Sequence, residues 1–165
     1  MKKVYAMLDR LIRLGAYIAG ILIIITTAMV FYEVISRSFF HKPTTWATEL
    51  SIYAVIWSCF LGSAYAVRTY SHITVDLLIN NVNDRMKTVL AYISNALGLV
   101  FSIIFTLYGY LHVMKTFGLE VTSSSLLRVP MYIPEMAIPI GGALLCIAFT
   151  MQIIDGGIHK GGENL

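Results

Sequence analysis

Long uninterrupted runs of apolar residues fill about half of the chain, and charged residues stand at the ends of these runs. Four runs contain no Asp, Glu, Lys or Arg: residues 14–32, 50–67, 88–114 and 136–154. Because a helix rises about 1.5 Å per residue, roughly 20 residues cross a hydrocarbon core of about 30 Å. Each run is therefore long enough to span a bilayer. The pattern predicts an all-α membrane protein with four transmembrane helices.

These runs organise the chain as one integral membrane domain, residues 1–165. The expected transmembrane helices cover about 13–36, 46–67, 88–114 and 134–155. Between the second and the third, the segment at about 71–87 repeats apolar side chains at helical spacing, with polar side chains between them. That spacing predicts a short amphipathic helix lying in the membrane interface. The alternative is a cytoplasmic extension of the third transmembrane helix.

Composition supports a membrane protein and gives no sign of a nucleic-acid partner. The mean hydropathy is +0.75, and 13% of the residues are charged, whereas soluble domains carry about 25%. The net charge of +3 is modest, and the basic residues sit beside the ends of the apolar runs. That placement indicates orientation in a membrane, because a nucleic-acid site would gather them into one stripe.

The basic residues divide unevenly between the two sides of the predicted membrane span. Eight of the twelve Lys and Arg residues fall on the side that holds both termini and the connection between the second and third helices. Cytoplasmic loops of membrane proteins carry an excess of Lys and Arg. We therefore expect a multi-pass protein with both termini in the cytoplasm.

The second predicted helix has two patterned faces. Small residues recur at every fourth position: Ala54, Ser58, Gly62 and Ala66. Such a stripe lets another helix approach closely, which is how packing is gained in lipid. The neighbouring face carries Glu49, Tyr53 and Trp57, also spaced by four. One side of this helix is therefore suited to a close partner, either another protein or another helix of this chain.

Two acidic residues, Glu33 and Glu49, lie at the outer ends of the first and second predicted helices. Arg37 follows Glu33 by four positions, so the two side chains can form an ion pair on one helix face. Because ionisable groups near lipid are costly, each should have a partner. Their position near the membrane boundary favours an ion pair that fixes the first two helices over a proton or cation relay.

The remaining polar residues form no constellation typical of catalysis or of a cofactor site. The four histidines fall at different depths or in different loops, so two of them cannot supply the axial ligands of a haem. Cys59 and Cys146 lie inside apolar runs without neighbouring ligands, which favours apolar packing over a disulfide or a metal site. The sequence shows no phosphate-binding loop or nucleophile constellation. We expect no enzyme activity, no cofactor and no metal.

Several short motifs follow one another in a specific order. The second helix opens with Trp46-Ala47-Thr48-Glu49, has Trp57 and Phe60-Leu61-Gly62 at its middle, and is followed by His72-Ile73-Thr74-Val75-Asp76. Before the fourth helix stands Pro130-Met131-Tyr132-Ile133-Pro134. This order resembles the small membrane subunit of tripartite ATP-independent periplasmic (TRAP) transporters. The resemblance covers the whole chain in topology, and about residues 37–77 and 130–141 in motif.

The resemblance implies a function for the chain as one part of a larger assembly. Such a subunit has four transmembrane helices in the bacterial inner membrane, with both termini in the cytoplasm. It pairs with a larger membrane subunit that holds the substrate and sodium sites, and a periplasmic binding protein delivers the substrate. The substrate is an organic acid such as a C4-dicarboxylate, a 2-keto acid or a sialic acid. The small subunit would be a non-catalytic scaffold, surrounded by membrane lipid.

Within that role the patterned residues receive two expected tasks. Trp46, Glu49, Tyr53 and Trp57 would face the large subunit or brace that face, and Arg37 and Gly62 would be partner-interface or structural residues. Arg68, His72 and Asp76 would form a polar cluster that holds the segment 71–87 against the second helix.

Two other functions are compatible with four apolar helices. A self-sufficient small exporter acting as a homodimer would need a carboxylate at mid-depth, whereas Glu33 lies near a helix end. A membrane anchor of a respiratory enzyme would need histidines at matching depth, and the histidines of this chain do not match. Both alternatives are therefore less well supported by the residues than a transporter subunit.

Overall fold

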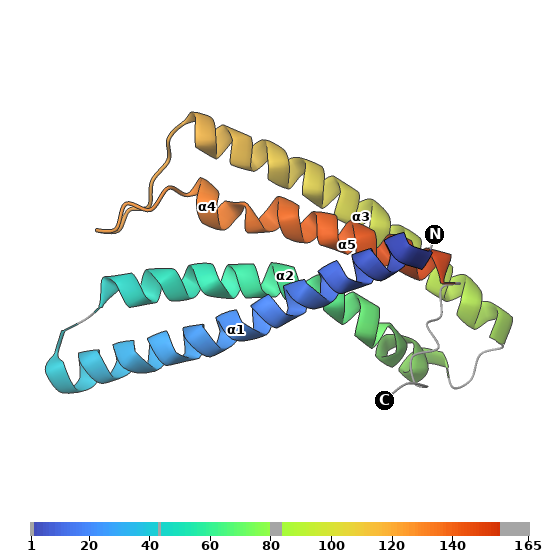
Figure 1. The fold of residues 1–165 in the computed structure, drawn as a ribbon, viewed down its shortest axis with the longest axis horizontal. Helices are drawn as coiled ribbons and strands as arrows, with labels where there is room; N and C mark the ends of the chain where they lie inside the picture. Colours follow the sequence, from blue (N-terminus) through green and yellow to red (C-terminus); the bar gives the residue numbers. More distant parts are fainter. Residues whose placement is uncertain (1, 43, 80–83, 156–165) are drawn as a thin grey trace.

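The computed structural model describes residues 2–42, 44–79 and 84–155, with side chains for all of these except 2, 4, 70–79, 84, 85 and 87. The described residues form five helices: α1 (Lys2–Phe40), α2 (Thr45–Ile79), α3 (Asp84–Gly118), α4 (Tyr132–Glu135) and α5 (Ala137–Ile154) (Figure 1). In this part of the chain the only β-structure is an isolated bridge between Thr122 and Pro130. The predicted all-α class is confirmed.

Four stretches of helix are long and apolar enough to cross a membrane. They cover Tyr5–Phe40, Thr45–Thr69, Thr88–Gly118 and Tyr132–Ile154. Each contains one of the uncharged runs of the sequence, so the prediction of four membrane-spanning helices is confirmed. α1, α2 and α3 extend beyond the predicted limits, because the polar residues that flank an apolar run continue the same helix.

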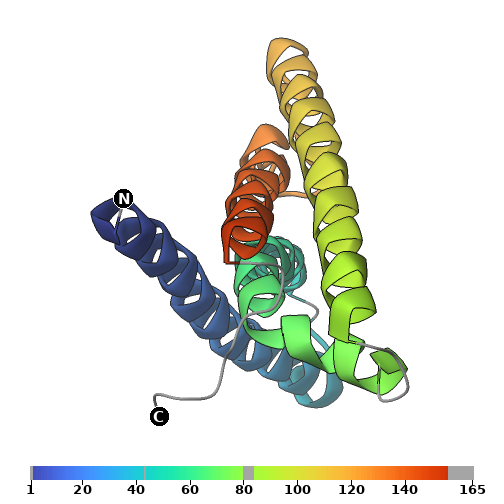
Figure 2. The same ribbon diagram turned by 90° about the vertical axis from the view of Figure 1, so that its right-hand side faces the viewer.

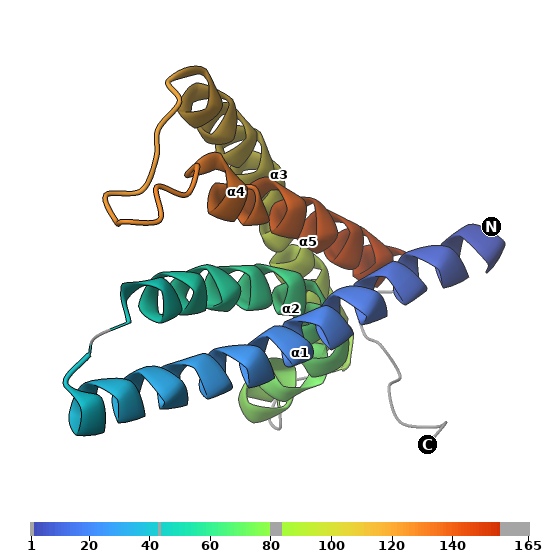
Figure 3. The same cartoon turned by 60° about the vertical axis from the view of Figure 1, so that its left-hand side comes forward.

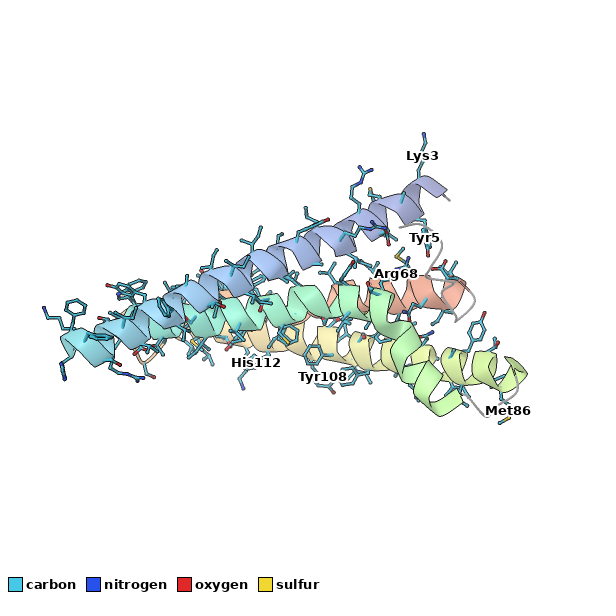
Figure 4. The ribbon with its side chains drawn as sticks, turned by 90° about the horizontal axis from the view of Figure 1, so that it is seen from below. Lys3, Tyr5, Arg68, Met86, Tyr108 and His112 are labelled. Atoms are coloured by element: carbon cyan, nitrogen blue, oxygen red, sulfur yellow. The ribbon has the colours of Figure 1, made fainter. Side chains whose placement is uncertain are left out.

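The segment after the second span differs from the expected separate helix. Residues 71–79 continue α2, and α3 begins at Asp84. The last turns of α2 run at an angle to its first part, as Figures 2 and 4 show. The side chains of 71–79 lie outside the described ones. The amphipathic character of this segment and its place in the membrane interface therefore stay predictions.

The fourth span consists of two helices separated by a break. α4 is a single turn, and α5 begins after Met136. Pro139 stands in the first turn of α5, where the missing backbone N–H removes no bond within the helix. The predicted helix at about 134–155 is therefore helical apart from one interruption at Met136.

The spans stand in a row and do not close around a common axis. α1 packs against α2, α2 against α5, and α5 against α3, whereas α1 and α3 have no contact among the described residues. Figure 2 shows α2 and α5 between the two outer helices, and Figure 3 shows the α1–α2 hairpin beside the α3–α5 hairpin. Each outer helix therefore has one packed face and one unpacked face.

Burial follows this arrangement. The packed face of α1 carries Ile12, Ala19, Thr26 and Ser36, and that of α3 carries Ala91, Asn95, Ser102 and Val113, all buried. The opposite faces carry large exposed apolar side chains, among them Tyr17, Ile24 and Phe31 on α1. Exposed apolar faces of this kind are suited to lipid or to another membrane protein.

Glycines permit the closest approaches between helices. A Cβ atom on Gly141 of α5 would lie 2.6 Å from Phe60 Cβ of α2, and one on Gly98 of α3 would lie 2.5 Å from the Phe149 ring of α5. Gly142 of α5 lies equally close to Thr106 of α3. In lipid, helices gain packing by bringing small residues together. α5 is therefore held tightly on both sides.

The helices of the row have two ends along their length, and the chain is connected differently at each. At one end, Tyr5 of α1 and Asp155 after α5 are in contact, so the beginning and the end of the described chain lie together. At the other end, residues 119–131 form a hairpin closed by hydrogen bonds from Ser123 N to Val129 O and from Met131 N to Val121 O, both 2.9 Å. We call these the terminal end and the hairpin end.

Candidate functional site

A buried arginine joins three helices at the terminal end. The Arg68 side chain of α2 is only 8% exposed. Its Nη1 donates to Asp155 Oδ2 at 2.8 Å, and its Nη2 donates to Asp9 Oδ1 at 3.3 Å. Because Asp9 belongs to α1 and Asp155 follows α5, one guanidinium connects three helices. Arginine is suited to this role, since its planar fork presents donors in several directions.

Tyr5 completes this group, which we call the Arg68 cluster (Tyr5, Asp9, Arg68 and Asp155). The Tyr5 hydroxyl donates to Asp155 and accepts a hydrogen bond from Arg68 Nη2 at 3.2 Å. Its ring centroid lies 5.5 Å from the guanidinium carbon, within the range of a cation–π contact. Figure 4 shows the two side chains pointing toward each other. Arg68 therefore contacts each of the other three side chains of the cluster.

The described ion pairs of this region join two cations to two carboxylates. Asp9 also pairs with the exposed Arg13, with 2.9 Å between Nε and Oδ2. A buried charge is tolerated only where it is paired and hydrogen-bonded. Beside the cluster, Gln152 of α5 donates to the Val67 carbonyl of α2. The chemistry of this group is that of a clamp between helices, with every described charge paired.

A second polar group, the Glu49 cluster (Glu49, Tyr53, Ser123 and Ser125), lies at the hairpin end. Glu49 of α2 is 9% exposed. Its carboxylate accepts a hydrogen bond from the Tyr53 hydroxyl at 2.6 Å and another from the Ser125 hydroxyl. Ser125 lies within 3.1 Å of Ser123, which in turn accepts from Val129 N at 3.2 Å. Glu49 therefore ties the hairpin 119–131 to α2.

The Glu49 cluster borders an open cleft of about 570 Å³ between the start of α2 and the hairpin. Thr45, Thr48 and Ile52 line it from α2, and residues 121–125 line it from the hairpin. The Arg68 cluster thus joins helices at the terminal end, and the Glu49 cluster joins α2 to the hairpin at the hairpin end. Apolar helix lies between the two clusters, so polar contacts hold the helices together at both ends of their length.

Comparison with known proteins identifies the family. The family model for the DctQ component of tripartite ATP-independent periplasmic transporters matches residues 26–156. The chain belongs to this family. It is a small membrane subunit of a TRAP transporter.

Individual relatives agree with this assignment. The chain is 32% identical over 116 residues to the C4-dicarboxylate TRAP transporter small permease protein DctQ of Rhodobacter capsulatus, which is 70% of this chain and 50% of that protein. It is 28% identical over 158 residues to the protein of the same name from Vibrio cholerae, covering 81% of this chain and 68% of that protein. The chain thus spans half the length of the first of these relatives.

A third similarity reaches a much longer protein. Part of the chain is 28% identical over 75 residues to the sialic acid TRAP transporter permease protein SiaT of Haemophilus influenzae, which is 46% of this chain and 12% of that protein. The segment similar to this small TRAP subunit is therefore a minor part of SiaT.

Of the predicted interface residues of the small TRAP subunit, Trp46, Glu49 and Tyr53 lie at the hairpin end, and Trp57 lies farther along α2. Trp46 is partly exposed and its ring lies 5.9 Å from that of Tyr32. Trp57 is half-buried. Glu49 and Tyr53 bond to each other and to the hairpin of the same chain. This geometry braces one face of α2, and its contact with a large subunit stays a prediction.

The predicted ion pair between Glu33 and Arg37 is present, with 3.8 Å between the charged atoms. Both residues belong to α1, so the pair does not by itself fix α1 to α2 as the sequence suggested. An aromatic contact of Tyr32 with Trp46 does join the two helices at this level. Arg37 is largely exposed, which keeps it available for other contacts.

The small-residue stripe of α2 partly faces another helix of this chain. A Cβ on Gly62 would lie 3.5 Å from Ala19 Cβ of α1. Ser58 is buried, Ala54 is half-buried and Ala66 is exposed. The stripe thus serves packing within the chain at Gly62, which is one of the two alternatives that the sequence left open.

The sequence predicted a cluster of Arg68 with His72 and Asp76, and the structure describes only the Arg68 side chain of the three. The side chains of His72 and Asp76 lie outside the described ones, so their part stays a prediction. The partners that the structure gives Arg68 are Tyr5, Asp9 and Asp155, which the motif did not name. A signal was available, because acidic residues flank the apolar runs on the same side of the predicted membrane as Arg68.

Proposed function

We propose that this chain is the non-catalytic scaffold of a TRAP transporter that takes up an organic acid across the bacterial inner membrane. Family membership supports the transporter, and the names of the relatives, C4-dicarboxylate and sialic acid transporters, support a carboxylic acid as substrate. In this proposal a larger membrane subunit holds the substrate site, a periplasmic binding protein delivers the substrate, and a sodium gradient drives uptake.

The observation that carries the scaffold role is the open row of helices braced at both ends. Three grooves open outward: one between α2 and the hairpin, one between α1 and α2, and one between α1 and α5 at the terminal end. The Arg68 and Glu49 clusters engage their charges in contacts within the chain. A carrier instead needs a polar site near the middle of the membrane between two repeats. The row is better suited to support a partner than to carry a substrate.

The orientation of the scaffold follows from charge and contact together. The contact of Tyr5 with Asp155 places the two described ends of the chain at one end of the row. Most of the Lys and Arg residues belong to that end, and cytoplasmic segments are enriched in them. The terminal end therefore faces the cytoplasm in this proposal, and the hairpin end faces the periplasm and the binding protein.

Reconstituted uptake tests the proposed function. Proteoliposomes would contain the large subunit with this chain, the large subunit alone, or this chain alone, each supplied with the binding protein and a radiolabelled C4-dicarboxylate or sialic acid. We expect uptake only with both membrane subunits and an inward sodium gradient. Transport by this chain alone would contradict the scaffold role and support the self-sufficient exporter.

A further inference from the structure

A groove of about 360 Å³ runs between α1 and α2 toward the hairpin end of the row. Its lining mixes two kinds of side chain. Its polar residues are Thr26, Glu33, Thr48 and Ser51, and its apolar residues are Val30, Ile52, Val55 and Ile56. Thr26, Glu33 and Ser51 are buried or largely buried, whereas Val30, Ile52 and Val55 are about half exposed and Thr48 is exposed too. The groove therefore has a polar floor and a mostly apolar rim.

Thr26 is the unusual member of the floor. It is 8% exposed, and its hydroxyl has no hydrogen-bond partner among the described residues. The next residue, Thr27, shows the ordinary arrangement for a helix in lipid, with its hydroxyl donating to the Ile23 carbonyl at 2.9 Å. A buried hydroxyl without a partner is costly, and hydrocarbon supplies none. The hydroxyl of Thr26 therefore needs a hydrogen-bond partner from outside the described part of the chain.

Glu33 has unused accepting capacity on the same side of α1. Its only described ion pair is with Arg37 at 3.8 Å, and the Arg37 side chain is 63% exposed. A carboxylate offers about four lone-pair positions, so one long contact leaves most of them open. Thr26 and Glu33 are seven residues apart, two helical turns or about 10 Å along α1. A single partner helix lying in the groove could therefore contact Thr26 and Glu33 with two of its own side chains, spaced two turns apart.

The apolar rim decides between lipid and protein as the occupant. Val30, Ile52 and Val55 suit either an acyl chain or a helix. An acyl chain offers the hydroxyl of Thr26 and the carboxylate of Glu33 no hydrogen bond, whereas polar side chains on a transmembrane helix satisfy such groups. The negative charge of Glu33 favours a donor on that helix.

We propose that the α1–α2 groove seats one transmembrane helix of the large subunit, which places a polar side chain against Thr26 and a hydrogen-bond donor against Glu33. This inference rests on the proposed function, because it assumes a large membrane partner. It adds the face of the row at which that partner binds and the chemistry by which it is recognised. The exposed face of α1, opposite the groove, then faces lipid.

Paired variants of neighbouring threonines test the hydroxyl. Thr26→Val keeps the shape and removes the unpartnered hydroxyl, and Thr27→Val is the matched control. The co-expressed complex would be purified in mild detergent, and the dissociation constant of the large subunit measured by dilution. Interhelical hydrogen bonds in membranes predict roughly threefold weaker association for Thr26→Val and no change for Thr27→Val. Equal behaviour of the two variants would contradict a partner at Thr26.

Filling the groove tests its occupancy independently of the hydroxyl. Val30→Trp places a large ring in the groove, and Ile21→Trp places the same ring on the exposed, opposite face of α1. We expect Val30→Trp to reduce the recovered large subunit at least tenfold and Ile21→Trp to leave it unchanged. Correct folding of each chain is checked by its monodisperse elution without the partner. A well-folded Val30→Trp chain that binds normally would overturn the proposal.

Photo-crosslinking identifies the occupant directly. A photoreactive phenylalanine at position 30 should yield an adduct with one transmembrane helix of the large subunit, and the same probe at position 21 should label lipid. Lipid adducts alone at position 30 would assign the groove to an acyl chain and overturn the proposal. If the large subunit purifies with the unaltered chain while these groove variants have no effect, the inference fails and the scaffold function stands. If it never purifies with the chain, both fail.

Discussion

Arg68 fixes three helices through a single side chain, so its removal should affect the whole terminal end. Arg68→Ala leaves Asp9 and Asp155 without their shared cation. Both carboxylates are partly exposed, so we expect a loss of about 2–3 kcal/mol, toward the lower end of the cost of breaking a buried pair. The measurement is the midpoint of unfolding in mixed micelles with increasing SDS.

Two companion variants sharpen that experiment. Arg13→Ala removes an exposed ion pair with the same Asp9 and should cost no more than about 0.5 kcal/mol. Arg68→Lys keeps the charge but cannot present donors to Asp9, Asp155 and Tyr5 together, so it should fall between Ala and Arg. An Arg68→Ala chain as stable as Arg13→Ala would show that the cluster does not hold the helices.

Glu49 should control the hairpin at the other end of the row. Glu49→Ala removes the acceptor of the Tyr53 and Ser125 hydroxyls. Loss of these hydrogen bonds to a charged group should make opening of the hairpin roughly tenfold more frequent. Trypsin should then cut the hairpin at the exposed Arg128 about ten times faster. Glu120→Ala, an exposed acid of the same hairpin, should leave the rate unchanged, and equal rates would refute the tie.

The polar residues show what the sequence could and could not predict at this scale. The position of Glu49 at a helix end, and the need of every charge near lipid for a partner, followed from the pattern. The identity of the partners did not. Arg68 meets residues 59 and 87 positions away in the sequence, and Glu49 meets a serine 76 positions away. Such contacts depend on the order of the helices, which no local motif encodes.

At the scale of the helices, α5 depends on glycine to fit between α2 and α3. Gly141→Ala would place a methyl group 2.6 Å from Phe60 Cβ and 2.9 Å from the Phe60 carbonyl oxygen, so backbone must shift. Overpacking of this kind costs about 1–3 kcal/mol. We expect the unfolding midpoint in SDS to fall accordingly.

Gly20 supplies the matched control for that change. It lies in α1 with no other side chain or neighbouring helix within 4 Å of an added Cβ. Alanine is the better helix former by about 0.5–1 kcal/mol, so Gly20→Ala should leave the protein unchanged or slightly more stable. If Gly20→Ala and Gly141→Ala change the unfolding midpoint in the same direction, the close contact of α5 with α2 is wrong.

Helix prediction succeeded where a long apolar run determines the outcome, and it was weaker elsewhere. The spans follow from the uncharged runs, since a bilayer requires about 20 such residues. The small residues of α2 predicted that its stripe allows a close approach, but the shortest approaches at glycines involve Gly98, Gly109, Gly141 and Gly142. Small residues permit close packing, but the sequence does not say which permitted contacts are made.

At the scale of the whole molecule, the arrangement predicts which parts of the chain are reachable from each side of the membrane. In a chain with Cys59 and Cys146 replaced by alanine, Lys3→Cys lies at the terminal end and Glu120→Cys at the hairpin end. An impermeant maleimide added to intact spheroplasts should label Glu120→Cys and reach Lys3→Cys only after permeabilisation. The reverse pattern would invert the proposed orientation.

The row of helices connects these observations into one account. α1 and α3 expose apolar faces because neither packs against the other, and both ends of the row are held by polar contacts within the chain. A row of this shape leaves room for a large partner beside it. The order α1, α2, α5, α3 could not be predicted from the sequence, because four apolar runs are compatible with several packings.

Purification from native membranes tests the central claim, that this chain is a scaffold for a larger membrane subunit, most directly. The tagged chain would be isolated in mild detergent, and its mass and that of every associated protein measured. The account predicts a one-to-one complex with a single protein of many transmembrane spans. A chain that purifies alone as a homo-oligomer, with full stability, would contradict the account and redirect attention to Glu33 and Glu49 as transport residues.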